Sequence, residues 1–468
     1  MTTTAASLPE RKQFLGHPVG LYILFFTELW ERFSYYGMRA LLVLYLVAET
    51  QDGPKGGLGW SQEDALQLYG WYTMLVYVAS IPGGIVADRL FGQKRTVMIG
   101  GLTLCAGHLV LALPGLASFY GGLGLIILGV GMLKPNISSM VGELYPPGDE
   151  RRDKGFSIFY MGINIGAVLA GFIIGTVGEV YGWHYGFGLA GFGMLLGQAV
   201  YMWGQRHLKR IGELSTGAEA SPEQLAAASR PLTKAERDRV LVIFLSFFLT
   251  IVFWGAFEQA GGLMNLFASD HTDLTIGSFE VPATWFQSLN PAYIILLAVP
   301  VASFWIAWGR RGHEESSLFK MAIGTMIMGW GFLFMVAASM QVDGGEKAWM
   351  GWLILAYLFH TIGELCASPV ALSFVTKLAP VKYAALMMGA YFAATGFGNK
   401  LAGLIGEAAV GDLGPTTVFI GVAGFTTVVG IVVIAALKPL KRLTHGAEDR
   451  TPKTVHEAEQ TETEPAAF

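Results

Sequence analysis

An apolar stretch at residues 20–48, long enough to cross a lipid bilayer, contains four ionisable side chains: Glu28, Glu31, Arg32 and Arg39. With Tyr35 and Tyr36 they are three or four positions apart, so on a helix they share one face. A charged residue near the bilayer centre costs about 2.5–3.5 kcal/mol and is kept where it meets a partner or a wet cavity. Carboxylates exchange protons and guanidinium groups bind anions, so this face predicts a working site. The alternative is a static ion-pair network that fixes helix packing, but the acids outnumber what one structural pair needs.

Three more ionisable residues lie inside other apolar stretches: Lys134, Glu258 and Glu364. An unpaired charge there is costly. We therefore expect Lys134 and Glu364 to bind each other, or a ligand of opposite charge, across a central cavity. Arg39 and Glu258, nearer the outer ends of their stretches, provide a second pair between the two halves of the chain.

The composition indicates a membrane protein with several spans. With 468 residues, 53% hydrophobic and 14% charged, the chain is too apolar for a soluble protein and too long for one core. The net charge of −4 shows no basic excess, which argues against a nucleic-acid partner. His360 and Glu364 lie one helical turn apart without a further ligand, and no nucleophile has a base in reach. We expect no metal, no cofactor and no enzyme activity.

Apolar windows of about 20 residues, each most simply a membrane-spanning helix, recur about twelve times. They cover residues 17–48, 62–88, 94–114, 118–145, 154–178, 185–205, 239–262, 285–309, 317–340, 347–378, 382–410 and 414–437. Lys and Arg cluster on alternate connections, which by the positive-inside rule places those connections and both termini in the cytoplasm. The predicted fold class is an all-α polytopic membrane protein.

One long polar insert divides these windows six and six. The predicted units are a cytoplasmic N-terminal tail at 1–16, an N-terminal six-helix bundle at 17–205, a cytoplasmic linker at 206–238, a C-terminal six-helix bundle at 239–442 and a disordered cytoplasmic tail at 443–468. Within the linker, residues 223–228 are compatible with a short surface helix.

Several motifs are similar to those of known transporters. The turn at residues 83–95, with Asp88 and Arg89, resembles the loop signature of the major facilitator superfamily. Residues 28–37 fit ExxERFxYYG, the signature of the proton-dependent oligopeptide transporters within that superfamily. Further similarity to this family comes from residues 131–136, residues 159–166, Phe253, Trp254, Glu258, Gln259, Gly363, Glu364, Ser368 and Pro369.

The resemblance implies a major facilitator fold of twelve helices in two six-helix bundles and a proton-coupled symporter of di- and tripeptides in a bacterial-type inner membrane. Many bacterial relatives carry two extra helices between the halves. Residues 206–239 are too short and too polar for them, so we expect none. In the family, ion pairs between the halves act as gates, which here would be Lys134 with Glu364 inside and Arg39 with Glu258 outside. We expect a monomer.

A free peptide has a carboxylate at one end and an ammonium at the other. Arg32 and Lys134 are candidates to bind the carboxylate, and Glu364 to bind the ammonium. Further substrate contacts are expected from Tyr35, Tyr36, Arg39, Tyr72, Asn164, Trp254, Asn290, Ser368 and Tyr391. Of these, Tyr391 stands where the resemblance leads us to expect tryptophan.

Proton coupling requires carboxyl groups whose pKa changes with conformation. The candidates are Glu28, Glu31 and Glu258. Protonation of Glu28 or Glu31 would free Arg32 for the peptide, and protonation of Glu258 would weaken its pairing with Arg39. Two alternatives stay open: transport of another small anion or zwitterion, such as nitrate or an amino acid, and a sensor that binds peptide without moving it.

Overall fold

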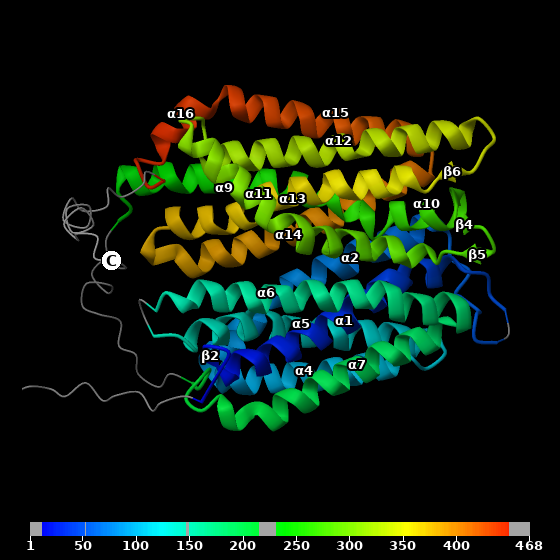
Figure 1. Cartoon of the computed structure of the whole chain (residues 1–468), viewed down its shortest axis with the longest axis horizontal. Helices are drawn as coiled ribbons and strands as arrows, with labels where there is room; N and C mark the ends of the chain where they lie inside the picture. Colours follow the sequence, from blue (N-terminus) through cyan, green and yellow to red (C-terminus); the bar gives the residue numbers. More distant parts are fainter. Residues whose placement is uncertain (1–11, 52, 147–148, 215–230, 449–468) are drawn as a thin grey trace, which may run out of the picture.

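The computed structural model describes residues 12–51, 53–146, 149–214 and 231–448. Its long helices run roughly parallel to one another, with the segments before residue 205 in the lower part of Figure 1 and those after residue 234 in the upper part. The first group consists of α1 (Val19–Val47), α2 (Gln62–Val78), α3 (Ser80–Val86), α4 (Gly92–Leu111), α5 (Leu116–Glu143), α6 (Arg151–Ala170) and α7 (Trp183–Gly204). The second consists of α9 (Lys234–Phe257), α10 (Leu263–His271), α11 (Leu289–Arg310), α12 (Ser317–Asp343), α13 (Gly351–Leu378), α14 (Ala384–Val410), α15 (Pro415–Ala435) and α16 (Leu437–Leu443).

Shorter elements join these helices. Wider π-helical turns are η1 (Ala87–Phe91), η2 (Gly171–Gly175) and η3 (Val177–Tyr181), and tighter 3-10 turns are η4 (Gln205–His207), η5 (Glu258–Ala260), η6 (Ala283–Ser288) and η7 (Val381–Tyr383). Two-residue strands pair as β1 (Gln13–Phe14) with β2 (His17–Pro18), β3 (Thr272–Asp273) with β6 (Ala348–Trp349), and β4 (Thr275–Ile276) with β5 (Phe279–Glu280). We call the end of the molecule that carries β3 to β6 the β6 end, and the opposite end the α16 end (Figure 1).

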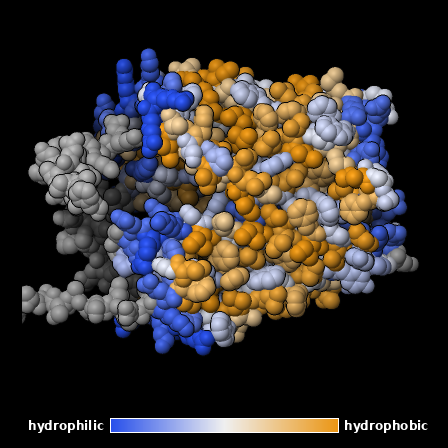
Figure 2. All heavy atoms as spheres, viewed as in Figure 1, coloured by the Kyte–Doolittle hydropathy of each residue, from blue (hydrophilic) through white to orange (hydrophobic). Residues whose placement is uncertain are grey.

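The surface fits a bilayer. Figure 2 shows a belt of apolar side chains around the middle and hydrophilic side chains at the two ends. In the described part of the chain, eight helical stretches are long and apolar enough to cross a membrane. One of them, Gln62–Leu111, is 50 residues long, far more than a single crossing needs, and turns at Gly92, whose φ is +75°. Helix α1, with its four charged residues, is not among the eight.

Some helices begin or end at other residues than the apolar windows predict, because polar capping or close packing determines their ends. Helix α9 begins at Lys234, five residues before its window, because Thr233 and Glu236 form a reciprocal capping box. The same window predicts one helix through residue 262, but α9 ends at Phe257 and α10 begins only after Gly261 and Gly262. A side chain at Gly261 would overlap the Tyr69 hydroxyl, so glycine is what allows α2 to approach here.

The predicted linker and C-terminal tail are described only in part. The predicted surface helix at 223–228 lies outside the described residues, as does the tail beyond residue 448. Residues at the start of the tail and just before it bind back to the helices. Arg239 Nε donates to the Thr444 carbonyl at 3.0 Å, and Lys441 pairs with Glu314 at 2.9 Å.

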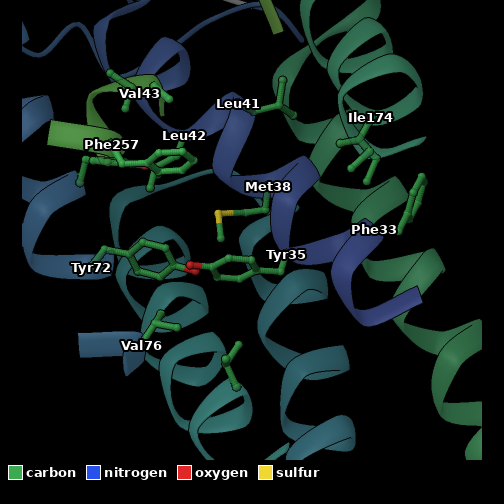
Figure 3. Packing of buried hydrophobic residues seen from close by; sticks show 14 of the residues in the cluster. Phe33, Tyr35, Met38, Leu41, Leu42, Val43, Tyr72, Val76, Ile174 and Phe257 are labelled. Carbon is green, nitrogen blue, oxygen red and sulfur yellow. The ribbon is translucent and has the colours of Figure 1, made fainter. Parts of the chain in front are cut away.

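The two groups of helices meet closely along α2 and α14. A Cβ at Gly403 would lie 2.7 Å from the Leu66 carbonyl oxygen and 2.9 Å from Gly70 Cα, both backbone atoms. Around α1, buried apolar side chains such as Met38 and Leu42 pack together with Val76 of α2 (Figure 3). These contacts hold the helices that carry the ionisable residues at fixed spacing.

Candidate functional site

The charged face of α1 forms a compact ion cluster. Arg32 Nε lies 3.2 Å from Glu28 Oε1, and it also donates to Glu31 Oε2. The three side chains are at most 3% exposed. Among the described residues, Glu28 Oε2, Glu31 Oε1 and Arg32 Nη2 have no hydrogen-bond partner. The cluster can therefore accept a proton on one acid while the other still pairs with Arg32, and Arg32 retains a free donor.

A second ion cluster joins α1 to the start of η5. Arg39 Nη1 donates to Oε1 and Oε2 of Glu258, both at 3.1 Å, and the Tyr69 hydroxyl of α2 donates to Glu258 Oε2 at 2.7 Å. Arg39 also lies over the ring of Tyr36, 5.0 Å from its centroid. This cluster connects the two groups of helices on the β6 side of the charged face of α1.

Lys134 and Glu364 lie on α5 and α13, on opposite sides of the molecule's centre. Among the described residues they form no ion pair with each other. Lys134 Nζ instead lies 4.1 Å from the centroid of the Tyr77 ring. Glu364 Oε2 accepts a hydrogen bond of 2.7 Å from Asn290 Nδ2, which also donates to Thr361 at 3.0 Å. Both charges are therefore satisfied by weak or neutral partners and are available to a ligand.

Both helices contain a proline close to these charges. Pro135 follows Lys134 within α5, and Pro369 lies five residues after Glu364 within α13. Because proline has no N–H group, each removes one backbone hydrogen bond from its helix. The helices carrying the two opposed charges thus share a local weakness beside the site.

These clusters surround a cavity of about 310 Å³ between the two groups of helices. Of the residues predicted from sequence, those lining it are Glu28, Arg32, Tyr36, Arg39, Lys134, Asn164, Trp254, Asn290, Glu364, Ser368 and Tyr391. The lining also includes Ser138 and Leu372, which lie beyond Lys134 and Glu364 toward the α16 end. The cavity therefore extends in that direction, while the Arg39–Glu258 contact lies on its β6 side.

Four predicted residues do not line the cavity: Glu31, Tyr35, Tyr72 and Glu258. Glu31 and Glu258 lie behind it and contact Arg32 and Arg39, which do line it. Tyr35 and Tyr72 are 4% and 2% exposed and point toward one another between α1 and α2 (Figure 3). They belong to the packing beneath the site, so a direct substrate contact from these two rings has no support in this arrangement.

The polar or aromatic residues at the site that were not predicted as site residues include Tyr69, Tyr77, Tyr160, Gln287 and Tyr357. Helical spacing could have found most of them. Tyr69 and Tyr77 are eight positions apart on α2, Tyr160 precedes Asn164 by four, and Tyr357 precedes Glu364 by seven. Gln287 lies in η6, where no helical periodicity applies. It donates to the Ala260 carbonyl at 2.6 Å and the Tyr357 hydroxyl at 3.1 Å.

The cavity lining has a net positive charge on one side, where Arg32, Arg39 and Lys134 outnumber Glu28, and a negative charge on the other. Arg32 and Lys134 come from helices before residue 205, and Glu364 comes from a helix after residue 234. An apolar belt, helices that cross a bilayer and a central cavity with fixed charges together define a helical membrane transporter.

Comparison with known proteins identifies the family. A model of the POT family matches residues 94–229 and 216–411. The uncharacterized transporter YclF of Bacillus subtilis is 38% identical, covering 94% of this chain and 97% of its own length. The peptide transporter YePEPT of Yersinia enterocolitica is 35% identical, covering 95% of this chain and 99% of its own length. The di-/tripeptide transporter of Lactococcus lactis subsp. cremoris is also 35% identical, covering 92% of this chain and 97% of its own length. The chain belongs to the POT family, which confirms the resemblance found in its motifs.

Solved structures of similar proteins support the same family assignment. The crystal structure of a peptide transporter POT in complex with sulfate superposes with a TM-score of 0.85 at 36% identity, covering 92% of this chain and 97% of that one. A POT family transporter in complex with 5-aminolevulinic acid gives a TM-score of 0.83 at 30% identity, covering 92% and 98%. The helices described above thus have the arrangement of POT transporters.

Proposed function

We propose that this protein is a symporter that imports di- and tripeptides together with protons by alternating access. The observation that carries the proposal is the division of charge in the cavity, with Arg32 and Lys134 on one side and Glu364 on the other. A free peptide matches this division, because its carboxylate can bind the two cations and its ammonium can bind Glu364. Asn164 and Asn290 can exchange hydrogen bonds with its amide groups, and Trp254 and Tyr391 offer aromatic surface to its side chains. The names of the Yersinia and Lactococcus relatives support the same substrate class.

The proposed architecture is a twelve-helix major facilitator fold of two six-helix bundles. The twelve spans would be α1, α2 with α3, α4, α5, α6 with η2 and η3, α7, α9 with α10, α11, α12, α13, α14 and α15. The alignment with YclF is 494 positions long, more than the 468 residues of this chain, so YclF has residues that this chain lacks. The absence of an extra helix pair at residues 206–238 is proposed because that segment is too short and too polar for two spans. The proposed setting is the inner membrane, as a monomer with both termini in the cytoplasm, so that the α16 end faces inward.

We assign the Arg39–Glu258 contact to the outer gate and Lys134 with Glu364 to the inner gate. In the structure the first pair is formed and the second is apart, and the cavity extends toward the α16 end. This is the combination expected for an inward-facing state. In the outward-facing state Arg39 and Glu258 would separate, and Lys134 and Glu364 would approach each other or hold the substrate between them.

Glu28, Glu31 and Glu258 are the proposed proton carriers. Each contacts an arginine, Arg32 or Arg39, so protonation removes a charge–charge interaction and changes what that arginine can bind. A proton on Glu28 or Glu31 leaves Arg32 free for the peptide carboxylate. A proton on Glu258 weakens the outer gate. The inward proton gradient would therefore drive loading and opening from the outside.

The test is uptake of a labelled dipeptide into proteoliposomes with and without an inwardly directed proton gradient. Accumulation above equilibrium only with the gradient is the expected result. Its absence, or accumulation of nitrate or a single amino acid instead, would reject peptide symport. Binding without accumulation would identify a sensor.

Substitution at Glu364 tests how the peptide is held. Glu364→Gln should raise KM for a free dipeptide about tenfold, because one charge-assisted contact to the ammonium is lost. It should have little effect on an N-acetylated dipeptide, which has no ammonium. Glu346→Gln, at an exposed loop position, is the matched control.

A second candidate, transport of another small zwitterion, is favoured by one observation. A POT family structure of 30% identity is described in complex with 5-aminolevulinic acid, which carries an amine and a carboxylate but no peptide bond. Competition by this compound against the labelled dipeptide, compared with direct uptake of each, separates the two substrate classes.

A further inference from the structure

A second set of contacts joins the two groups of helices at the β6 end, away from Arg39 and Glu258. Glu179, in η3, accepts hydrogen bonds from the backbone N–H groups of Ala283 at 3.0 Å and Thr284 at 2.8 Å. The Thr284 hydroxyl also donates to Glu179, at 2.5 Å. These donors lie at the first turn of η6, where backbone N–H groups have no partner within the turn. The carboxylate therefore caps η6 from the opposite group of helices.

Neighbouring residues make this a continuous seam, which we define as residues 168–179 against residues 283–288. Trp285 Nε1 donates to the Thr176 hydroxyl at 2.8 Å, and the Ser288 hydroxyl donates to the Val168 carbonyl at 2.8 Å. A Cβ at Gly171 would lie 3.0 Å from the Thr284 carbonyl oxygen, so glycine permits the close approach. Thr284 and Ser288 are fully buried.

The seam borders the substrate cavity. Gly171 lines the cavity from one side, and Gln287, within η6, lines it from the other. Helix α11 follows η6 directly and places Asn290 against Glu364 at 2.7 Å. Any displacement of η6 therefore moves residues that line the cavity as well as opening the β6 end.

Every hydrogen bond that the Glu179 carboxylate makes in the described part of the chain crosses this seam. Its donors are neutral, and no ion pair among the described residues involves it. Separation of the two groups of helices here would break three hydrogen bonds of one carboxylate at once. The contact therefore belongs to one conformation rather than to the packing of either group.

We propose that Glu179 stabilises the state of the transport cycle in which the β6 end is closed. Glu179 does so through η6, and the Arg39–Glu258 contact does so through α1. The proposal rests on the alternating-access cycle proposed above, but it does not depend on the substrate. In the outward-facing state Glu179 would leave Ala283 and Thr284 and face water. It is a positioning residue, because it acts through η6 and α11 and does not line the cavity itself.

The test measures the opening of the β6 end by the distance between two spin labels. Suitable sites are Leu113, after α4, and Leu413, after α14, which are 57% and 56% exposed and lie in different groups of helices. The labelled cysteines are introduced after Cys105 and Cys366, the two native cysteines, have been replaced by alanine. No peptide is added, so failure of peptide uptake and failure of this proposal are separate results.

Glu179→Ala should raise the population ratio of the long-distance to the short-distance state about tenfold or more, because a carboxylate with three hydrogen bonds is removed from the short-distance state. Thr284→Val, which keeps the backbone N–H but loses the hydroxyl, should give a smaller shift, and Thr284→Ser should restore the original ratio. Glu280→Ala removes an exposed acid close to the seam whose charge can only repel Glu179, so it should not raise the ratio.

An unchanged distance distribution for folded Glu179→Ala would overturn the proposal, as would an equal shift in Glu280→Ala. If Glu179→Ala does not fold, Glu179→Gln is measured in its place. It retains one carbonyl acceptor and turns an amide N–H group toward the donors of η6, so it too must favour the open state. A loss of thermal stability without a change in the distance distribution would show a purely structural role and would also overturn the proposal.

Discussion

Tyr69→Phe is the smallest change that isolates one hydrogen bond of the Arg39–Glu258 contact. The Tyr69 hydroxyl donates to Glu258 at 2.7 Å, and the Tyr69 side chain is 1% exposed. Phenylalanine keeps the ring and its packing but leaves Glu258 Oε2 with Arg39 alone. The substitution therefore tests whether this contact stabilises closure of the β6 end.

The size of the effect follows from the charge on Glu258. A hydrogen bond to a charged group contributes about 1.5–3 kcal/mol, roughly twice the value for neutral partners. If the bond exists only when the β6 end is closed, its loss shifts the closed-to-open equilibrium by the same amount. At about 1.4 kcal/mol per factor of ten, the open population rises roughly 10- to 150-fold relative to the closed one.

The assay is again the distance between labels at Leu113 and Leu413, measured without substrate. Tyr120→Phe is the matched control, because Tyr120 is 48% exposed on α5 and its hydroxyl makes no hydrogen bond among the described residues. An unchanged distribution in Tyr69→Phe, with the protein folded, would show that the hydroxyl contributes nothing to closure and would refute the reasoning. A similar shift in Tyr120→Phe would show that the labels report general loosening.

Two further predictions concern proton coupling and helix packing. Glu31→Gln keeps an acceptor for Arg32 but cannot carry a proton, so it should abolish gradient-driven accumulation of a dipeptide while exchange of dipeptide across the membrane continues. Full gradient-driven uptake by this variant would remove Glu31 from the proton carriers. Gly403→Val would place a side chain against the backbone of Leu66 and Gly70, so it should force α2 and α14 apart and reduce both thermal stability and uptake. Gly424→Val on α15 should have little effect on either, because a Cβ added at Gly424 would have no neighbouring atom within 4 Å. Equal loss of stability and uptake in the two variants would contradict the packing argument.

The sequence predicted site residues best where a charged side chain lies in an apolar, membrane-length window. The cost of placing Glu28, Arg32 and Lys134 in an apolar window is large whatever the conformation, so their position at a cavity between helices could be inferred from residue type alone. The same reasoning linked Arg39 with Glu258 across 219 positions of sequence, and the two residues are in contact in the structure. Periodicity then added their helical neighbours.

The remaining features depend on conformation and on close packing. Lys134 and Glu364 have the composition of an ion pair, but in the structure Glu364 binds Asn290 and Lys134 lies over Tyr77. In the proposed cycle, whether the two charges meet would depend on which end of the cavity is closed. Tyr35 and Tyr72 share the spacing of the site residues, yet a small rotation about the helix axis turns them into the packing between α1 and α2. Glu179 lies near the end of an apolar window, where an acid usually faces water. Two of its three hydrogen-bond donors are backbone N–H groups of η6, which no side-chain pattern identifies.

The interruption between α9 and α10 has a mechanical consequence. The regular backbone hydrogen bonding of α9 stops at Phe257, and the chain resumes as α10 only at Leu263, after the glycine pair. Glu258 is the first residue of this interruption. Residues 263–271 are therefore not joined to α9 by a continuous helix, and the carboxylate whose protonation is proposed to release the outer gate stands at the break itself. In the proposed cycle, a change at Glu258 would act where α10 can alter its angle to α9 without either helix having to bend.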